Sequence, residues 1–244
     1  MNYLIAGLFG LCIGSFLNVV IFRLNTGRSI GGRSRCLSCS HILSPIDLVP
    51  VLSYLCFRGR CRYCKARINI QYPVVELSTA IVFVLIVWRF PELSLFGLLV
   101  LTAMCADLIA ILVYDLRHKI IPDQLVYAFI VLAMLGHYSI AGTIFTWAGP
   151  ALFALFALIW LVSRGKWMGF GDAKLVLGIG FLLGPEIAFT AMLLAFWSGA
   201  IVGIIGLLVK RSSLTMKSEI PFAPFLILAT LWQLFFPIYF NLIL

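Results

Sequence analysis

Charged residues are scarce in this chain. They make up 11% of its 244 residues, against 63% hydrophobic residues, and the mean hydropathy is +1.10. A soluble domain is about half apolar and carries about one quarter charged residues. One soluble core cannot bury such an apolar surplus, so lipid must be the solvent for most of it. The composition therefore predicts an integral membrane protein.

Acidic residues are scarcer still, with nine Asp and Glu against 18 Lys and Arg, which gives a net charge of +9. A basic balance is also typical of nucleic-acid-binding proteins. Here, however, the cations lie between apolar runs and not along one soluble face, which is the pattern of topology signals. We therefore predict no nucleic-acid partner.

Several catalytic motifs are absent. The three histidines belong to no recognisable triad, and the chain has neither Gly-x-Ser-x-Gly nor His-Glu-x-x-His. Serine-hydrolase and zinc-protease interpretations are therefore without support. A Gly-rich nucleotide loop after a strand is also missing, so no cofactor site can be derived from a motif.

The apolar runs predict an all-α polytopic membrane protein with about eight transmembrane helices. The first run lacks a basic start and a small-x-small cleavage site, so we interpret it as a retained helix. The sixth is interrupted by three glycines and Pro185. The runs cover residues 2–22, 74–90, 93–114, 124–142, 144–163, 174–190, 187–209 and 221–243.

The distribution of cations predicts the orientation. If eight spans alternate, every Lys and Arg except Arg89 lies on one side of the membrane. The positive-inside rule places these loops in the cytoplasm and both termini outside. We predict a first transmembrane helix at 1–22, a cytoplasmic domain at 23–73 and a membrane domain of about seven helices at 74–244.

Four of the seven cysteines form two Cys-x2-Cys pairs in the long polar segment: Cys36, Cys39, Cys61 and Cys64. This spacing is typical of a tetrahedral zinc site. Cytoplasmic thiols stay reduced, so disulfides are disfavoured here. A segment of this size is also too small to stay folded without an added link such as a bound metal. We predict a small zinc-binding insert whose closed site is structural. Redox-labile dithiols or a loop without metal are the alternatives. The other three cysteines are interpreted as packing residues.

Two aspartates stand out among the nine carboxylates. Asp115 ends the third predicted span and Asp172 opens the sixth, so both lie at the cytoplasmic boundary at one depth. Two close carboxylates share a proton, so that one activates water while the protonated partner polarises a carbonyl. This arrangement predicts an aspartyl dyad. Capping of a helix N-terminus is the alternative role for Asp172.

The residues around Asp172 form a candidate substrate-approach loop. Gly169 and Gly171 remove side-chain bulk, so that a substrate backbone can come near the acid, and Lys174 follows. Asp123 is interpreted mainly as a helix-capping residue. Asp107, about 12 Å along the helix from Asp115, is a secondary candidate because intramembrane carboxylates are often functional.

Six short sequence motifs, which follow one another along the chain, resemble those of the type IV prepilin peptidases. This family also serves type II secretion and competence systems. The two cysteine pairs and Asp115 form part of this resemblance. One departure is Asn25 in a motif that usually runs on to Arg-x-Pro. The remaining motifs are GSFLNVVIFR at 14–23, YPVVEL at 72–77, IPD at 121–123, GFGDAKL at 169–175 and PFAPF at 221–225.

The resemblance implies a membrane aspartic peptidase of the bacterial inner membrane, with Asp115 and Asp172 as the catalytic pair. Its implied partners are membrane lipids and prepilin or pseudopilin substrates. The implied reaction cleaves these substrates after a glycine, on the cytoplasmic side, and so removes a basic leader. It further implies methylation of the new N-terminal residue with S-adenosylmethionine. Asp47 and Glu76 are weak candidates for cofactor contacts.

Two other classes of protein remain open. A transporter would use the glycine-broken sixth span, with Asp107 or Asp172 lining an ion path. The two halves of the chain show no repeated pattern, which counts against it. A membrane scaffold would dock partners on the zinc domain.

Overall fold

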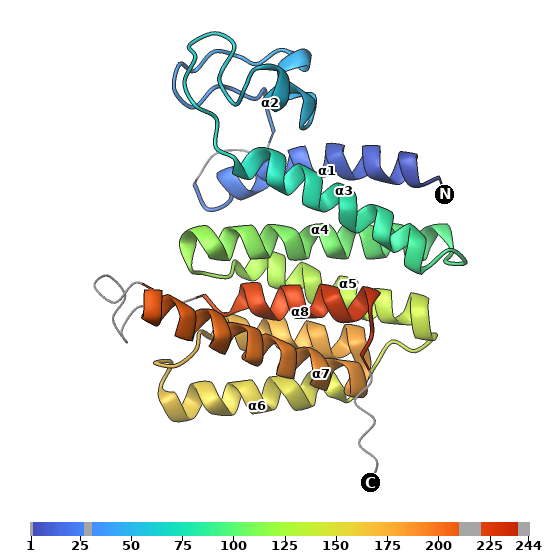
Figure 1. Ribbon diagram of the computed structural model, residues 1–244. Helices are drawn as coiled ribbons and strands as arrows, with labels where there is room; N and C mark the ends of the chain where they lie inside the picture. The colour runs from blue at the N-terminus through green and yellow to red at the C-terminus, as the bar shows by residue number, and fades with distance from the viewer. Residues whose placement is uncertain (1, 27–30, 210–220, 239–244) are drawn as a thin grey trace. The chain divides into compact units, whose positions relative to one another are not determined.

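The computed structural model describes residues 2–26, 31–209 and 221–238, except for the side chains of residues 207 and 209. Within these ranges the chain forms helices and loops with two isolated β-bridges and no sheet (Figure 1). The all-α class is therefore confirmed. The elements are α1 Tyr3–Arg23, η1 Pro45–Leu48, α2 Leu52–Cys56, α3 Gln71–Arg89, α4 Leu95–His118, α5 Asp123–Ala141, α6 Ala148–Ser163, α7 Phe170–Val209 and α8 Ala223–Phe235.

Five of these helices are long and apolar enough to cross a membrane: α1, α3, α4, α5 and α7, the last over residues 170–206. Helices α6 and α8 are apolar but shorter. A hydrophobic core of about 30 Å needs about 20 helical residues. The polytopic membrane architecture is thus confirmed, while the count of eight spans stays a prediction.

The chain divides into two compact units, Met1–Glu92 and Leu93–Leu244. The first unit contains α1, α3 and, between them, the segment 31–70, which we call the cysteine insert. The predicted division at residues 22/23 and 73/74 stays a prediction.

Small residues allow α1 and α3 to pack closely in the first unit. A Cβ atom added at Gly10 would lie 2.6 Å from the Cα of Ala80, and one added at Gly14 would lie 2.6 Å from the Cα of Glu76. Such distances are too short for any side chain. The two glycines therefore let the helix backbones meet, a usual device in membranes, where packing and not water exclusion joins helices.

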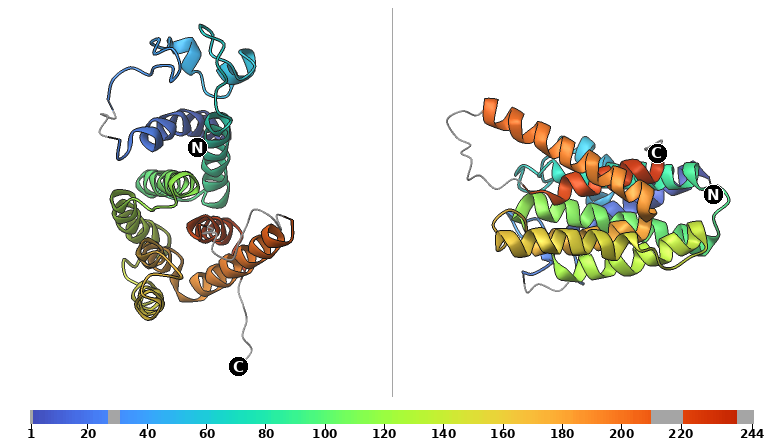
Figure 2. Two further views of the ribbon diagram at one scale, coloured as in Figure 1. Left: turned by 90° about the vertical axis from the view of Figure 1, so that its left-hand side faces the viewer. Right: turned by 90° about the horizontal axis from the view of Figure 1, so that it is seen from below.

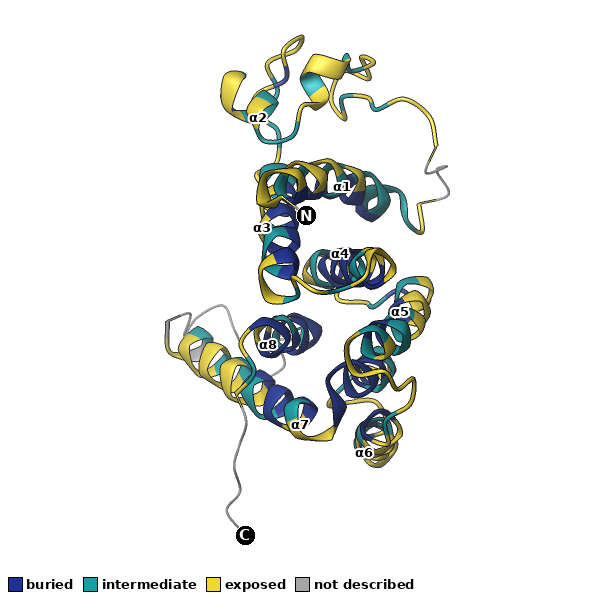
Figure 3. Ribbon diagram, turned by 90° about the vertical axis from the view of Figure 1, so that its right-hand side faces the viewer, coloured by how far each residue is buried: buried dark blue, intermediate teal, exposed yellow. Residues whose placement is uncertain are grey.

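The second unit contains α4 to α8, and its helices run side by side (Figures 1 and 2). Helix α7 has its own close contact with α6, because a Cβ added at Gly180 would lie 2.6 Å from the Cα of Gly149. Figure 3 shows that α8 and the first half of α7 are largely buried, while the end of α7 is exposed.

Helix α7 bends sharply at Gly184, whose φ of 72° and ψ of 177° are not helical. Pro185 cannot donate the helical hydrogen bond and disfavours helical geometry in the residue before it. Two aromatic residues of α7 contact rings of α6. The ring centroid of Phe170 lies 5.0 Å from that of Trp160, and the ring centroid of Phe196 lies 6.1 Å from that of Phe156. A straight helix would separate them by about 39 Å. The chain therefore folds back at Gly184, where the sixth and seventh apolar runs were predicted to meet.

Candidate active site

Asp115 lies in the last turn of α4 and is buried, with 4% of its surface exposed. The helix ends at Lys119, which has a left-handed conformation (φ 55°) and donates its N–H to the Asp115 carbonyl at 2.8 Å. One carboxylate oxygen of Asp115, Oδ2, is buried with no hydrogen-bond partner among the described residues. A buried polar atom without a partner is costly and unusual in a folded protein.

Asp172 lies in the first turn of α7 and is also buried. Its backbone N–H donates to the Gly169 carbonyl at 3.2 Å, which starts the helix. A Cβ added at Gly169 would lie 3.7 Å from Oδ2 of Asp172. A side chain at this position would therefore contact the carboxylate, and the glycine leaves that space free.

The end of α4, with Asp115, and the start of α7, with Asp172, lie at the same end of the second unit, as the helices in Figure 1 show. The start of α7 packs on the α4–α5 loop, since a Cβ added at Gly171 would lie 3.0 Å from Cβ of Ile121. The carboxyl groups of Asp115 and Asp172 are near enough to interact electrostatically. Like charges in a buried site cannot both ionise easily, so the arrangement favours the state in which one of the two carboxyls is protonated.

Lys174 also fastens the start of α7. Its Nζ donates to Oδ1 of Asp123, the first residue of α5, at 2.6 Å. The same Nζ lies 5.1 Å from the ring centroid of Tyr127 and 5.5 Å from that of Phe170. These contacts hold α7 beside α5. The role predicted for Lys174 and the two glycines in substrate approach stays a prediction.

Asp107 lies two turns further into α4. Its Oδ2 atom is buried without a hydrogen-bond partner among the described residues. The contacts of Asp107 assign it no role, and its predicted secondary role stays open.

The four cysteines of the insert come together as a possible metal site. Their Sγ atoms all lie within 4.8 Å of one another, and those of Cys36 and Cys64 are 3.9 Å apart. Tetrahedral zinc with Zn–S bonds of about 2.3 Å requires S–S distances of about 3.8 Å. All seven cysteines are free thiols, so the set fits zinc and not a disulfide pair.

The two cysteine pairs adopt the same local fold. The N–H of Cys36 donates to the carbonyl of His41, and that of Cys61 donates to the carbonyl of Ala66. The residue four positions after each first cysteine, Ser40 or Lys65, has a positive φ. Each pair thus forms one tight turn, and the two turns face a common centre.

The thiols of this centre titrate unequally. The backbone N–H of Cys39 lowers the pKa of Cys36 to about 7. The N–H of Ala66 acts to lower the pKa of Cys64, but burial and the neighbouring thiols raise it to about 11. Four thiolates at this distance therefore need a cation among them, and zinc would supply it.

The two weak cofactor candidates both hold the insert in place. The Asp47 carboxylate accepts hydrogen bonds from the N–H and hydroxyl of Ser44, at 2.9 and 2.8 Å, and from the Tyr63 hydroxyl at 3.2 Å. Glu76 accepts the N–H of Val51 at 2.7 Å. A role for them in cofactor binding stays a prediction. The contacts between Ser44 and Asp47 form a local capping box. The contacts with Tyr63 and Val51 join residues far apart in the chain, so sequence reasoning had no signal for them.

Comparison with known proteins identifies two family models along the chain. Residues 8–90 match the bacterial peptidase A24 N-terminal domain, and residues 101–204 match the type IV leader peptidase family. No solved structure matches the chain.

Several curated relatives carry the name prepilin leader peptidase/N-methyltransferase. That of Pseudomonas putida is 30% identical, over 92% of this chain and 87% of the relative. The Aeromonas salmonicida protein is 33% identical, over 91% and 86%, and the Burkholderia pseudomallei protein is 31% identical, over 100% and 88%. The chain therefore belongs to the type IV leader peptidase family.

Proposed function

We propose that this protein is a membrane aspartic peptidase that removes the leader from prepilins or pseudopilins. The observation that carries the proposal is the pair of buried, electrostatically interacting carboxyl groups of Asp115 and Asp172. They lie at adjoining helix ends, where a substrate helix in the membrane would present its junction with a polar leader. The family match favours this activity and gives the transporter alternative no support.

The pair can perform hydrolysis without a metal ligand of its own. One ionised carboxylate removes a proton from water, and its protonated partner donates a hydrogen bond to the scissile carbonyl. Water then adds to the carbonyl carbon to form a tetrahedral intermediate. This intermediate collapses when the leaving amine accepts a proton, which frees the leader and restores the shared proton. Gly169 leaves room for the peptide backbone beside Asp172.

The same protein methylates the new N-terminal residue in our proposal. S-adenosylmethionine would supply the methyl group as an electrophilic sulfonium. The names of the relatives support this second activity.

The proposed site opens to the cytoplasm of a bacterium, at the inner membrane. The loops that follow α1, α4 and α6 carry most of the cations, and such loops stay inside. Cleavage after a glycine on this side agrees with the position of both aspartates at one end of the second unit. With eight spans, both termini lie outside.

Aspartate-to-asparagine variants test the dyad. Purified protein is incubated with a prepilin and labelled S-adenosylmethionine, and leader cleavage and label transfer are followed separately. Asp115→Asn and Asp172→Asn should each slow cleavage by about 10²–10⁴-fold, the usual contribution of acid–base catalysis. Transfer of label to a pilin that is already cleaved should persist in both.

Glu186→Gln is the matched control, because it replaces an exposed carboxylate by an amide in the same helix α7. It should leave cleavage within about twofold of the wild type, as surface changes usually do. Cleavage that survives in either aspartate variant would remove that residue from the dyad. A wild type that neither cleaves nor methylates would overturn the function.

A further inference from the structure

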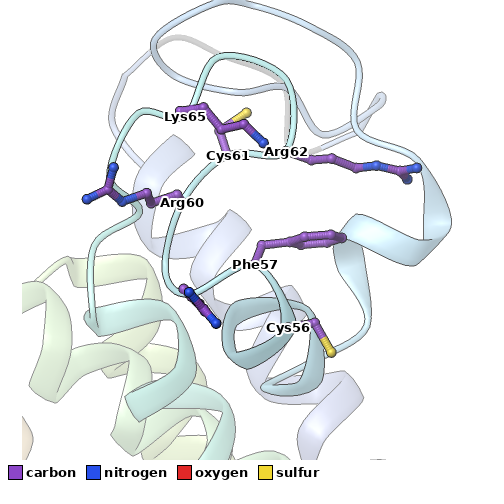
Figure 4. A pocket seen from close by; sticks show the side chains of 7 residues that line it. Cys56, Phe57, Arg60, Cys61, Arg62 and Lys65 are labelled. Carbon is purple, nitrogen blue, oxygen red and sulfur yellow. The ribbon is translucent and has the colours of Figure 1, made fainter.

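The cysteine insert contains a cavity of about 530 Å³ surrounded by cations. Figure 4 shows the side chains that line it, all from residues 56–65. Four of the seven are basic and none is acidic: Arg58, Arg60, Arg62 and Lys65 join Cys56, Phe57 and Cys61. Among the described residues, none of these cations forms an ion pair within 4 Å. The charge of Arg62 is partly balanced by the Asp47 carboxylate. An excess of cations around one cavity still predicts an anionic ligand.

A second feature, independent of the cavity, lies on the segment that precedes it. Apolar side chains of η1 and α2 face outward instead of into the insert, and Figure 3 shows α2 as largely exposed. Ile46 is 63% exposed, Leu52 60% and Leu55 63%. A cluster of exposed large apolar side chains on a small polar domain marks an interaction surface.

The depth of this segment identifies what covers it. Val51, which precedes α2, donates its N–H to Oε2 of Glu76 at 2.7 Å. Glu76 lies five residues inside α3 (Gln71–Arg89), which is about 7 Å along the helix from its start. Because α3 is long and apolar enough to span the membrane, α2 lies beside its first turns. Helix α3 is about as long as the hydrocarbon core is thick, so this level lies near the boundary between headgroups and hydrocarbon, where interfacial helices lie.

We propose that η1 and α2 lie in the membrane interface and that the cation-lined cavity binds the phosphate of an anionic phospholipid headgroup. Apolar side chains on one side and cations beside them are the pattern of interfacial membrane anchors. The proposal goes beyond the peptidase activity and does not depend on it.

Other anions and the methyl donor fit less well. S-adenosylmethionine carries a sulfonium and an ammonium group against a single carboxylate, so four cations would repel its net positive charge. A soluble phosphate compound would satisfy the cations but would leave the exposed leucines without a partner. A lipid satisfies both features.

Native mass spectrometry of the zinc-loaded full chain tests the proposal. The protein is titrated in detergent with phosphatidylglycerol and, separately, with phosphatidylcholine of the same chain length. The double variant Arg58→Gln/Arg60→Gln is compared with Arg33→Gln/Arg35→Gln, which removes the same charge from the insert at residues that do not line the cavity. One bound zinc per chain in both variants checks that the insert is folded.

The wild-type protein should bind phosphatidylglycerol more tightly than phosphatidylcholine. The cavity variant should bind it roughly thirtyfold more weakly, since each cation at an anionic surface contributes about fivefold in affinity. The control variant should change much less. Equal losses in the two variants would overturn the site. Binding of inorganic phosphate as tight as that of phosphatidylglycerol would overturn the lipid in favour of a soluble phosphate compound.

A photoactivatable phosphatidylglycerol tests the interface directly. In nanodiscs that contain it, the acyl chain should cross-link to residues 46–55 as well as to the spans. Cross-links to the spans alone would overturn the interfacial position of η1 and α2.

Discussion

The cysteine insert and the second unit differ in what holds them together. In the insert, residues 31–70, only Gly59 and Cys61 are buried. In the second unit most residues of the first half of α7 are buried, and α7 contacts α6 through the backbones of Gly180 and Gly149. The insert has almost no core, whereas the second unit is a set of packed helices.

This difference indicates which interactions each region depends on. A segment that buries so little surface cannot offset the conformational entropy of folding by packing alone. We therefore expect the insert to need zinc at its four cysteines, together with a few hydrogen bonds that involve Ser44, Tyr63 and Glu76. The helices of the second unit satisfy their own backbone groups and need close packing in the membrane. The two regions should respond to different changes.

Removal of the zinc site should have the largest effect, and only on the insert. Structural zinc contributes about 10–16 kcal/mol of apparent binding free energy in small zinc domains. Cys36→Ser should lose the metal and expose residues 31–70 to rapid hydrogen exchange, while residues 95–206 keep their protection. Hydrogen-exchange mass spectrometry and metal analysis measure both effects.

Cys56→Ser is the control for this change, because Cys56 is an exposed thiol of the same insert outside the group of four. It should keep one zinc per chain. A Cys36→Ser protein that still binds one zinc per chain would contradict the assignment of Cys36 as a ligand.

A single methyl group should disturb the second unit instead. Gly180→Ala places a Cβ 2.6 Å from the Cα of Gly149, and such overpacking costs about 1–3 kcal/mol. We expect unfolding at lower denaturant, measured by titration with sodium dodecyl sulfate, and no loss of zinc.

Gly199→Ala lies in the same helix, and its Cβ would be 3.5 Å from the nearest atom, on Phe225, which is an ordinary contact. This control should be neutral or slightly stabilising, because alanine is the better helix former. Equal destabilisation by the two alanines would refute close α6–α7 packing as the cause.

The sequence predicted the features that depend on composition and spacing. Long apolar runs located the helices, because lipid leaves the backbone few alternatives to a helix. The Cys-x2-Cys spacing predicted the thiol cluster, because each pair needs only one local turn. Asp115 and Asp172 were singled out because few carboxylates occur near predicted membrane boundaries, and their catalytic role stays a prediction.

Contacts between distant residues could not be predicted in the same way. No local pattern shows that Ile121 packs on Gly171, or that Val51 meets Glu76. The basic residues at 58–65 were interpreted as topology signals, since a count of charges does not show that four of them surround one cavity. The chain reversal at Gly184 was expected, but its geometry depends on how both halves of α7 pack on α6.

The smallest predicted effect concerns Asp47, which ties η1 to the second cysteine pair. Burial acts to raise the pKa of Asp47, but hydrogen bonds from Ser44 and Tyr63 and the charge of Arg62 lower it overall. A carboxylate with a lowered pKa stabilises the fold above its unfolded pKa of about 3.9 and loses this effect as the pH falls through the folded value. Asp47→Asn should therefore destabilise the insert equally at pH 8 and pH 6.

We expect this loss to be below about 1 kcal/mol, since the carboxylate is partly exposed and solvent screens it. The rate of zinc release to a chromophoric chelator measures it, with Asp47→Asn compared with wild type at each pH. Asp123→Asn serves as the control, because Asp123 is an exposed aspartate of the second unit whose partner is Lys174, and it should leave zinc release unchanged. A difference that already shrinks between pH 8 and pH 6 would mean that Asp47 titrates near neutrality. The hydrogen bonds to Ser44 and Tyr63 would then not be what stabilises its charge, and the insert would depend on the metal alone.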